Sequence, residues 1–259
     1  MLKQIFAPFG RTNKQIFIGL AISQAILALV LWHIGSNGLI PKPLNVVNAF
    51  INLLTSKNLI DNLLISFMLT LKAMGISILI TLFLAYLSVI PFFKTIALFV
   101  VKCRYLTLTG LIFIFTLLTK DGSALKLSLL IFGIVPFFVT SFLSVILTID
   151  SQQFEICETL GFSKWETLYE VIIVGKADQV VEIIRQNMAI AWLMITMVEG
   201  LSMSEGGLGT MLIKFNKYND ITNVLAVQLM IFIIGLLLDL ILGNLKYWLF
   251  PYSKLQIQQ

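Results

Sequence analysis

One polar stretch interrupts an otherwise apolar chain, and it reads EICETLGFSKWE over residues 155–166. Asp150 or Ser151, just before it, is suited to cap the free N–H groups of a first helix. Gly161 suits the left-handed residue that ends a helix, because glycine has no Cβ to clash there. Ser163 and Glu166 have the spacing of a capping box, which begins a second helix. The stretch therefore predicts a helix, a glycine elbow and a second helix, exposed outside the bilayer.

The composition indicates a membrane protein. Of the 259 residues, 58% are apolar and only 12% are charged, and the mean hydropathy is +0.96. A soluble domain carries about a quarter charged residues. The formal charge of +5 comes from scattered basic residues, which argues against a nucleic-acid partner. The length predicts one domain, residues 1–259, whose core is sealed by the lipid bilayer as well as by its own packing.

Six apolar segments are long enough to cross a membrane, since a helix needs roughly 20 apolar residues to span about 30 Å of hydrocarbon. They predict an all-α, polytopic fold in which the polar segment 150–178 lies between the fourth and fifth spans. We expect a loop with a short interfacial helix at 36–60 and a glycine-rich loop at 203–221. The predicted spans are 16–34, 62–90, 95–118, 126–149, 179–202 and 222–245.

The distribution of lysine and arginine predicts the orientation, because cytoplasmic loops carry an excess of both. A cytoplasmic N-terminus places both termini and the segment 150–178 in the cytoplasm. No small-residue cleavage site follows the first span, so we expect this span to remain in the protein. The cytoplasmic side then holds Lys3, Arg11, Lys14, Lys94, Lys164, Lys176, Arg185, Lys246 and Lys254, and the opposite side holds Lys42, Lys57, Lys120, Lys126, Lys214 and Lys217.

Ionisable side chains inside the spans mark candidate functional positions, because they are costly in lipid unless they are paired or hydrated. Glu199 either faces a hydrated cavity or holds two helices together at the outer interface. Arg185 can reach the cytoplasmic face, Asp239 can pair with Lys246 or with a neighbouring helix, and the sequence names no partner for Lys72. The candidate residues for a translocation pathway or gate are Trp192, Thr196, Glu199, Gly200 and Met203.

No catalytic or metal site is indicated by the sequence. The single histidine, His33, lies near the outer end of the first span, and Cys103 and Cys157 are expected to be packing residues. An intramembrane enzyme would need a converging acid, base or nucleophile set, which the spacing does not offer. The chain also has no Gly-x-x-x-x-Gly-Lys-Ser/Thr phosphate loop, so any ATP hydrolysis belongs to a partner.

The polar stretch resembles a known motif. Residues 155–161 look like the EAA loop of the permease subunits of ATP-binding cassette importers, in which Glu-Ala-Ala is followed by three residues and then Gly. The continuation is similar to the branch that imports nitrate, sulfonates and taurine. The resemblance extends in order along the chain through Leu31-Trp32, Ile40-Pro41, Gly161 to Trp165, Val171 to Ile173, Ala191-Trp192, Glu199, Gly207 to Gly209 and Gly235 to Asp239.

The resemblance implies a mechanical function in the bacterial cytoplasmic (inner) membrane. Two permease copies, or one copy and a close homologue, would enclose the pathway, while two cytoplasmic ATPase subunits bind and hydrolyse Mg-ATP. An extracytoplasmic binding protein would deliver a small anion such as nitrate, a sulfonate or taurine. Trp165 would hold the coupling segment to its own membrane domain. The residues expected at the ATPase are Glu155, Ile156, Cys157, Glu158, Leu160, Gly161 and Phe162, with Trp165 beside them.

The chain departs from that family's pattern in the coupling segment and the third span. Ile156 and Cys157 replace two alanines, and Glu158 stands where a basic residue is frequent. Val174 occupies the position of an expected proline, although Gly175 could end the helix instead. The third span also lacks the family's proline-rich opening. The alternatives are a solvated loop at this segment, the membrane component of an energy-coupling vitamin or thiamine-precursor importer, and an intramembrane enzyme.

Overall fold

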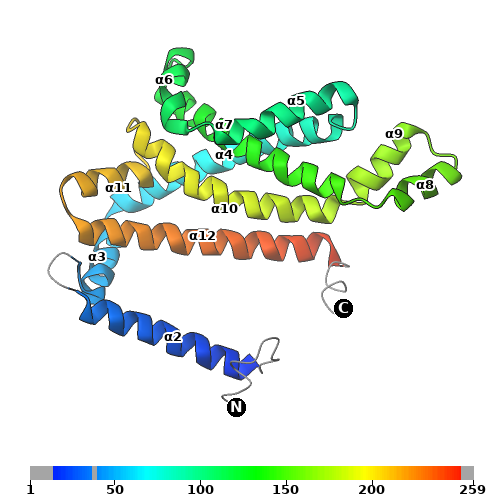
Figure 1. Ribbon diagram of the computed structural model, residues 1–259. Coiled ribbons are helices and arrows are strands. Elements are labelled where there is room, and N and C mark those ends of the chain that lie inside the picture. The colour runs from blue at the N-terminus through cyan, green and yellow to red at the C-terminus, as the bar shows by residue number, and fades with distance from the viewer. Residues whose placement is uncertain (1–13, 37–39, 252–259) are drawn as a thin grey trace.

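The structure is a computed structural model that describes residues 14–36 and 40–251, and every regular element within these ranges is a helix (Figure 1). The predicted all-α fold is confirmed. Helices suit a bilayer because they satisfy all of their backbone hydrogen bonds internally. In chain order the elements are α2 (Lys14–Ile34), α3 (Pro43–Thr55), α4 (Lys57–Leu87), α5 (Pro91–Lys102), η1 (Cys103–Tyr105), α6 (Leu108–Leu118), α7 (Gly122–Leu147), α8 (Ser151–Thr159), α9 (Lys164–Thr167), η2 (Leu168–Val174), α10 (Ala177–Leu201), α11 (Leu208–Lys217) and α12 (Ile221–Leu249).

Five helices within the described residues are apolar and long enough to cross a membrane: α2, α4, α7, α10 and α12. They confirm five of the six predicted spans, with boundaries that differ by a few residues. The second span begins earlier than predicted, because α4 starts at Lys57 and its first turns carry polar residues such as Asn58 and Asn62. A helix can continue past the hydrocarbon wherever water solvates its side chains.

The third predicted span, 95–118, is not one helix. The chain forms α5 and η1, then turns by 114° into α6. Leu106 and Thr107 have extended backbones, with ψ angles of 130° and 132°, so the helical hydrogen bonds cannot continue across them. The two helices contain 12 and 11 residues, and neither alone reaches the roughly 20 that a span needs. A sixth crossing exists only if the bent pair is counted as one broken span.

The stretch 203–221, predicted as a glycine-rich loop, contains the helix α11. Its apolar residues recur at helical spacing, so Leu208 and Met211 are buried while Lys214 and Lys217 lie in the last turn. This amphipathic pattern explains the helix. The other expected loop, 36–60, contains the predicted short helix, which is α3. Its first turn holds Pro43, a residue that suits the start of a helix.

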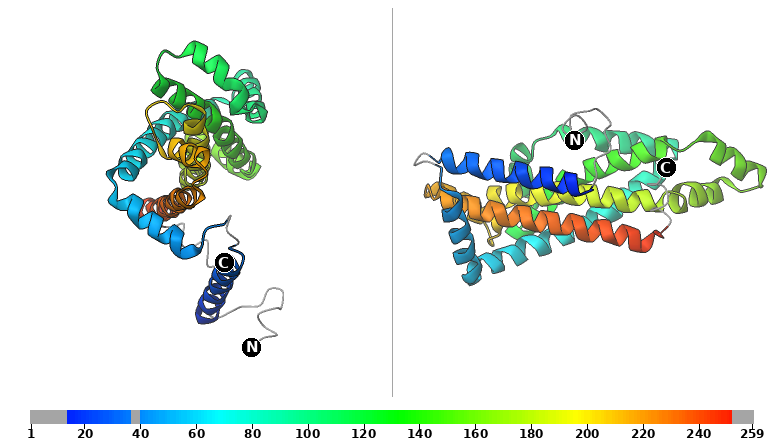
Figure 2. Two further views of the ribbon diagram at one scale, coloured as in Figure 1. Left: turned by 90° about the vertical axis from the view of Figure 1, so that its left-hand side faces the viewer. Right: turned by 90° about the horizontal axis from the view of Figure 1, so that it is seen from below.

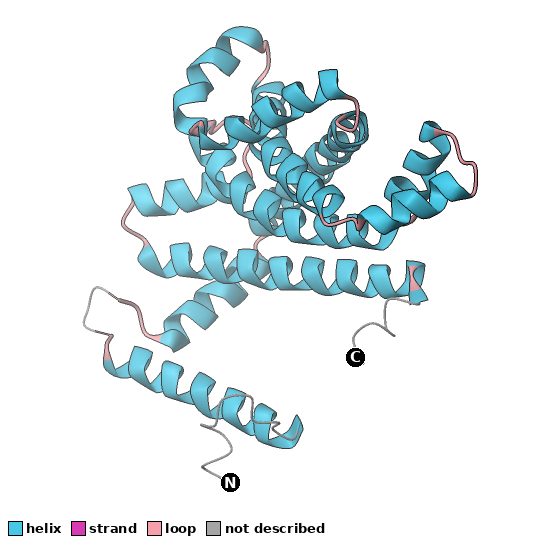
Figure 3. Cartoon of the chain, turned by 45° about the vertical axis from the view of Figure 1, so that its right-hand side comes forward, coloured by secondary structure: helices cyan, strands magenta, loops and turns pink. Residues whose placement is uncertain are grey.

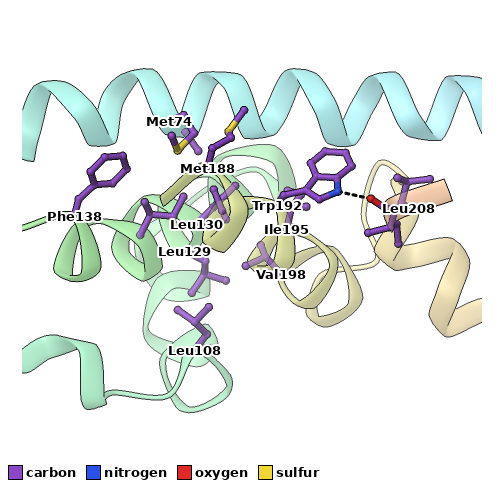
Figure 4. Packing of buried hydrophobic residues seen from close by; sticks show 14 of the residues in the cluster. Met74, Leu108, Leu129, Leu130, Phe138, Met188, Trp192, Ile195, Val198 and Leu208 are labelled. Carbon is purple, nitrogen blue, oxygen red and sulfur yellow. Dashed lines mark hydrogen bonds between the residues drawn. The ribbon is translucent and has the colours of Figure 1, made fainter. Parts of the chain in front are cut away.

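The core of the bundle forms around α7, which packs against α4, α5, α6 and α10. Half of the most apolar window of α7 is buried, whereas none of the window in α2 is. Figure 4 shows Leu129, Leu130 and Phe138 of α7 packed near Met188 and Ile195 of α10. Burial of these side chains holds the crossing helices in a fixed arrangement and so fixes the loops at both ends.

The helix α2 lies apart from the bundle, and its contacts are with α3 (Figures 1 and 2). Its large apolar side chains are exposed, for example Phe17 at 65% and Leu27 at 60%. The first residues of α2 and the end of α12 lie at the same end of the molecule as α8 and α9 (Figure 1). The predicted position of the two termini falls on residues outside the described ranges, and the side of the membrane that they share with the polar segment stays a prediction.

Candidate functional site

The polar segment forms a hairpin of short helices that projects from one end of the bundle (Figure 3). Asp150 caps α8 by accepting a hydrogen bond from the Gln152 N–H at 3.2 Å. The predicted capping box is present: the Ser163 N–H donates to Glu166 Oε2 at 2.7 Å, and the Glu166 N–H donates to Ser163 Oγ at 3.3 Å. Hydrogen bonds from Ser163 to the Glu166 carboxylate lower the pKa of that carboxyl. Both helix starts are therefore fixed by local side chains.

Gly161 forms the elbow between α8 and α9, as predicted. Its φ is +80°, which is the left-handed region. The Gly161 N–H donates to the Glu158 carbonyl at 3.0 Å, and the Phe162 N–H donates to the Cys157 carbonyl at 3.0 Å. This pair of bonds is the Schellman motif, which satisfies the last carbonyls of a helix while reversing the chain. We call the reversal, residues 155–165, the knuckle.

Burial divides the side chains of the knuckle into two groups, and this corrects two predicted roles. Cys157 is buried against Val171 and Ile172, so it holds the knuckle to the membrane domain and cannot form an outward contact. Trp165 is 67% exposed and does not hold the segment, contrary to the prediction. Four apolar side chains instead face outward, namely Ile156, Leu160, Phe162 and Trp165, and the predicted contact residues Glu155 and Glu158 are also exposed.

The second helix of the segment ends at Val174 without a proline. After one turn of α9 the chain widens into the π-helix η2, and the Gly175 N–H donates to the Glu170 carbonyl five residues earlier at 2.9 Å. Gly175 has a right-handed φ of −64°, so the helix does not end through a left-handed glycine. π-Helical turns are often found at functional sites. Here the wide turn connects the knuckle directly to α10.

Substitution of Gly161 with alanine is expected to destabilise the elbow by about 1 kcal/mol, because the left-handed φ disfavours a Cβ. Space is not the reason, since nothing lies within 4 Å of the position where the Cβ would be. Thermal unfolding in detergent checks this value. Gly161→Asn serves as the matched control, because asparagine tolerates the left-handed region. Equal losses for the two variants would contradict the conformational explanation.

At the opposite end of the bundle, Glu199 is fully buried and makes three hydrogen bonds through its carboxylate. Ser66 Oγ on α4 donates to both carboxylate oxygens at 2.7 and 2.9 Å, and the Gly209 N–H donates to Oε2 at 2.9 Å. Ser66 Oγ in turn accepts from the Leu208 N–H at 2.9 Å. The carboxylate thus connects α4, α10 and the start of α11, the arrangement expected of a side chain that holds helices together.

Lys126 of α7 binds the loop that joins α10 to α11. Its ammonium is buried and donates to the carbonyls of Ser204 and of Gly206, the latter at 2.9 Å. Asn62 Oδ1 accepts from the Gly207 N–H at 2.7 Å. We call these residues the outer clamp: Asn62, Ser66, Lys126, Glu199 and the loop 204–209. The sequence placed Lys126 among topology signals and gave no reason to select Asn62 or Ser66.

The five residues predicted for the pathway do not meet in one cavity. Trp192 and Thr196 line a groove of about 490 Å³ between α10 and α12, and Trp192 Nε1 donates to the Ile231 carbonyl at 2.9 Å. Glu199 belongs to the outer clamp. Gly200 packs against α11, and Met203 lies exposed beyond the end of α10.

Arg185 of α10 is held by two ion pairs, and its predicted reach to the cytoplasmic face stays a prediction. Its Nη1 lies 3.0 Å from Asp239 Oδ1 of α12, and its Nη2 lies 2.6 Å from Glu182 Oε1. Lys246 binds Glu182 at 3.1 Å rather than Asp239. The alternative in which Asp239 pairs with a neighbouring helix is therefore confirmed. Lys72 is exposed on α4.

These features define a polytopic helical membrane protein with a helical hairpin exposed at one end. The sequence profile of a family described as binding-protein-dependent transport system inner membrane component matches residues 55–251, about three quarters of the chain. The chain belongs to this family, the permeases of ATP-binding cassette transporters, and it is a multi-pass protein of the inner membrane. No curated protein matches it.

Proposed function

We propose that this chain is the membrane-spanning subunit of an ATP-binding cassette importer, and that the knuckle docks onto a cytoplasmic ATPase subunit. The observation that carries the proposal is the exposure of Ile156, Leu160 and Phe162 on a short polar hairpin. Large apolar side chains gathered on a projecting surface are typical of a protein interface. ATP hydrolysis in the partner would move α10 through the π-helical connection.

A second copy of the chain, or a close homologue, is the proposed partner within the membrane. The separate position of α2 supports this, because none of its most apolar window is buried within the chain and its surface is free to pack against a second copy (Figure 2). The pathway would lie between the two copies. The residues before position 55 fall outside the family match, so α2 would be an addition to the conserved bundle of the family.

For the remaining assembly we propose two cytoplasmic ATPase subunits, an extracytoplasmic binding protein, and both termini in the cytoplasm. The substrate would be a small solute of the class that includes nitrate, sulfonates and taurine. The competing function is the membrane component of an energy-coupling or thiamine-precursor importer. The length of the family match, from α4 through α12, favours the binding-protein-dependent type.

The orientation of the knuckle tests the proposal. Thr159 is exposed on α8, and a variant with cysteine there, in a background where Cys103→Ser and Cys157→Ala remove the native thiols, gives one reporter. We expect a membrane-impermeant maleimide to label it in inside-out vesicles and to leave it unlabelled in right-side-out vesicles. Co-expressed ATPase subunit should block the labelling. Labelling from the outside, or unchanged labelling when the ATPase is bound, would refute the assignment.

A further inference from the structure

The groove between α10 and α12 carries polar side chains on an otherwise apolar surface. Arg185 and Thr196 belong to its α10 wall, and Gln228 and Asp239 belong to its α12 wall. In each helix the two polar residues are eleven positions apart, which is about three helical turns. Equal spacing in both helices places each pair on one face, and the faces meet at the ion pair between Arg185 and Asp239.

Because α10 and α12 run in opposite directions (Figure 1), the four residues form two polar levels along the groove. Arg185 and Asp239 form the level nearer the knuckle, and Thr196 and Gln228 form the level nearer the outer clamp. The levels are separated by about 16 Å of helix, the rise of eleven residues. Trp192 and Phe232 are among the apolar residues between them.

The ion pair indicates that this face does not meet lipid, because charged side chains are costly in hydrocarbon. The Asp239 side chain is 48% exposed and the Arg185 side chain is 31% exposed, although both lie inside helices that span the membrane. Charged groups at such depth face protein or water rather than hydrocarbon. The groove must therefore be covered by another protein segment or filled with water.

At the level nearer the knuckle, the positive and negative charges are equal in number. Arg185 and Lys246 are the two cations, Glu182 and Asp239 are the two anions, and three ion pairs connect them. A bare anion entering the groove meets the Asp239 carboxylate beside the guanidinium, and a bare cation meets the guanidinium beside the carboxylate. A solute that carries one positive and one negative group can place the negative group at Arg185 and the positive group at Asp239.

We infer that the groove between α10 and α12 is this chain's share of the hydrated solute path between the two copies, and that its solute is a small zwitterion. This inference rests on the proposed transport function. The anionic end of the solute binds Arg185, and its cationic end binds Asp239. The two contacts replace the direct ion pair between these residues and keep the charge of the site balanced. Trp192 and Phe232 pack against the uncharged part of the molecule.

Accessibility to water tests the first half of the inference. Gln228→Cys places a thiol in the groove, and Ile241→Cys places one on the exposed apolar face of the same helix, where Ile241 is 61% exposed. Both use the background without native cysteines. We expect a charged methanethiosulfonate reagent to modify Q228C at least tenfold faster than I241C. Equal or slower modification of Q228C would show that another helix fills the groove and would overturn the inference.

Selectivity tests the second half. Uptake by the complete importer is measured for taurine, a zwitterionic sulfonate, and for isethionate, which has a hydroxyl group in place of the ammonium. We expect Asp239→Asn to shift the uptake ratio at least fivefold toward isethionate relative to the wild type, because the carboxylate that attracts the ammonium of taurine is lost while Arg185 keeps its ion pair with Glu182. The same binding protein serves both variants, so its own preference cancels. An uptake ratio that Asp239→Asn leaves unchanged would overturn the assignment.

These results can be separated from a failure of the proposed function. Modification of Q228C needs no ATPase subunit and reports the groove alone. The labelling of Thr159→Cys described above tests separately whether the knuckle faces the cytoplasm and binds the ATPase subunit. A hydrated groove together with a knuckle on the outer side would refute ATPase coupling and leave the groove assignment intact.

Discussion

Replacement of Gly207 with alanine is expected to cause a large loss of stability, about 3 kcal/mol or more in the free energy of unfolding. Gly207 has a φ of +113°, and an added Cβ would lie 2.3 Å from the Glu199 carboxylate carbon. The carboxylate cannot move away freely, because Ser66 Oγ and the Gly209 N–H bind it from two sides. Thermal unfolding of the detergent-solubilised protein, followed by tryptophan fluorescence, measures the loss.

Gly75→Ala is the matched control for this prediction. Gly75 lies inside α4, and nothing is within 4 Å of its hypothetical Cβ. Alanine is the better helix former, so this variant is expected to unfold at or above the wild-type temperature. A Gly207→Ala protein as stable as Gly75→Ala would show that the outer clamp does not hold the loop between α10 and α11.

The local parts of the knuckle could be predicted because their signals lie within a few residues of one another. A left-handed glycine and a four-residue capping box are determined by sequence neighbours, and they are present at Gly161 and at residues 163–166. What the neighbours do not determine is which face meets the bundle. Cys157 is buried because α8 packs against Val171 and Ile172, a contact that helical periodicity alone does not specify.

Most of the outer clamp could not be predicted from the sequence, because its contacts join residues far apart in the chain. Its hydrogen bonds connect Ser66 with Leu208 and Lys126 with Gly206, over 142 and 80 residues of sequence. Glu199 could be selected because a carboxylate in an apolar span is rare, but a serine or a lysine at a span end gives no comparable signal. The bend in the third span was missed for a related reason: a hydropathy window averages over Lys102 and Arg104, while the backbone between α5 and α6 turns beside them.

Substitution of Leu160 with aspartate is expected to reduce ATP-dependent solute uptake at least tenfold while leaving the fold intact. Leu160 is 66% exposed at the tip of the knuckle, so little packing within the chain is lost. At an interface with an ATPase subunit the new carboxylate would be buried without a partner. Leaving a charge unpaired in an interface weakens binding by several kcal/mol. Uptake in vesicles and co-purification of the ATPase subunit measure the effect.

Ser151→Asp controls for the added charge, because Ser151 is exposed at the start of the same helix, where a negative charge favours the helix dipole. This variant should retain both uptake and co-purification. Leu160→Met, which conserves volume and polarity, should retain them as well. If Leu160→Asp kept wild-type uptake and its ATPase partner, the exposed apolar residues of the knuckle could not be the surface that receives the force of ATP hydrolysis. The transmission would then have to pass through another part of the cytoplasmic face.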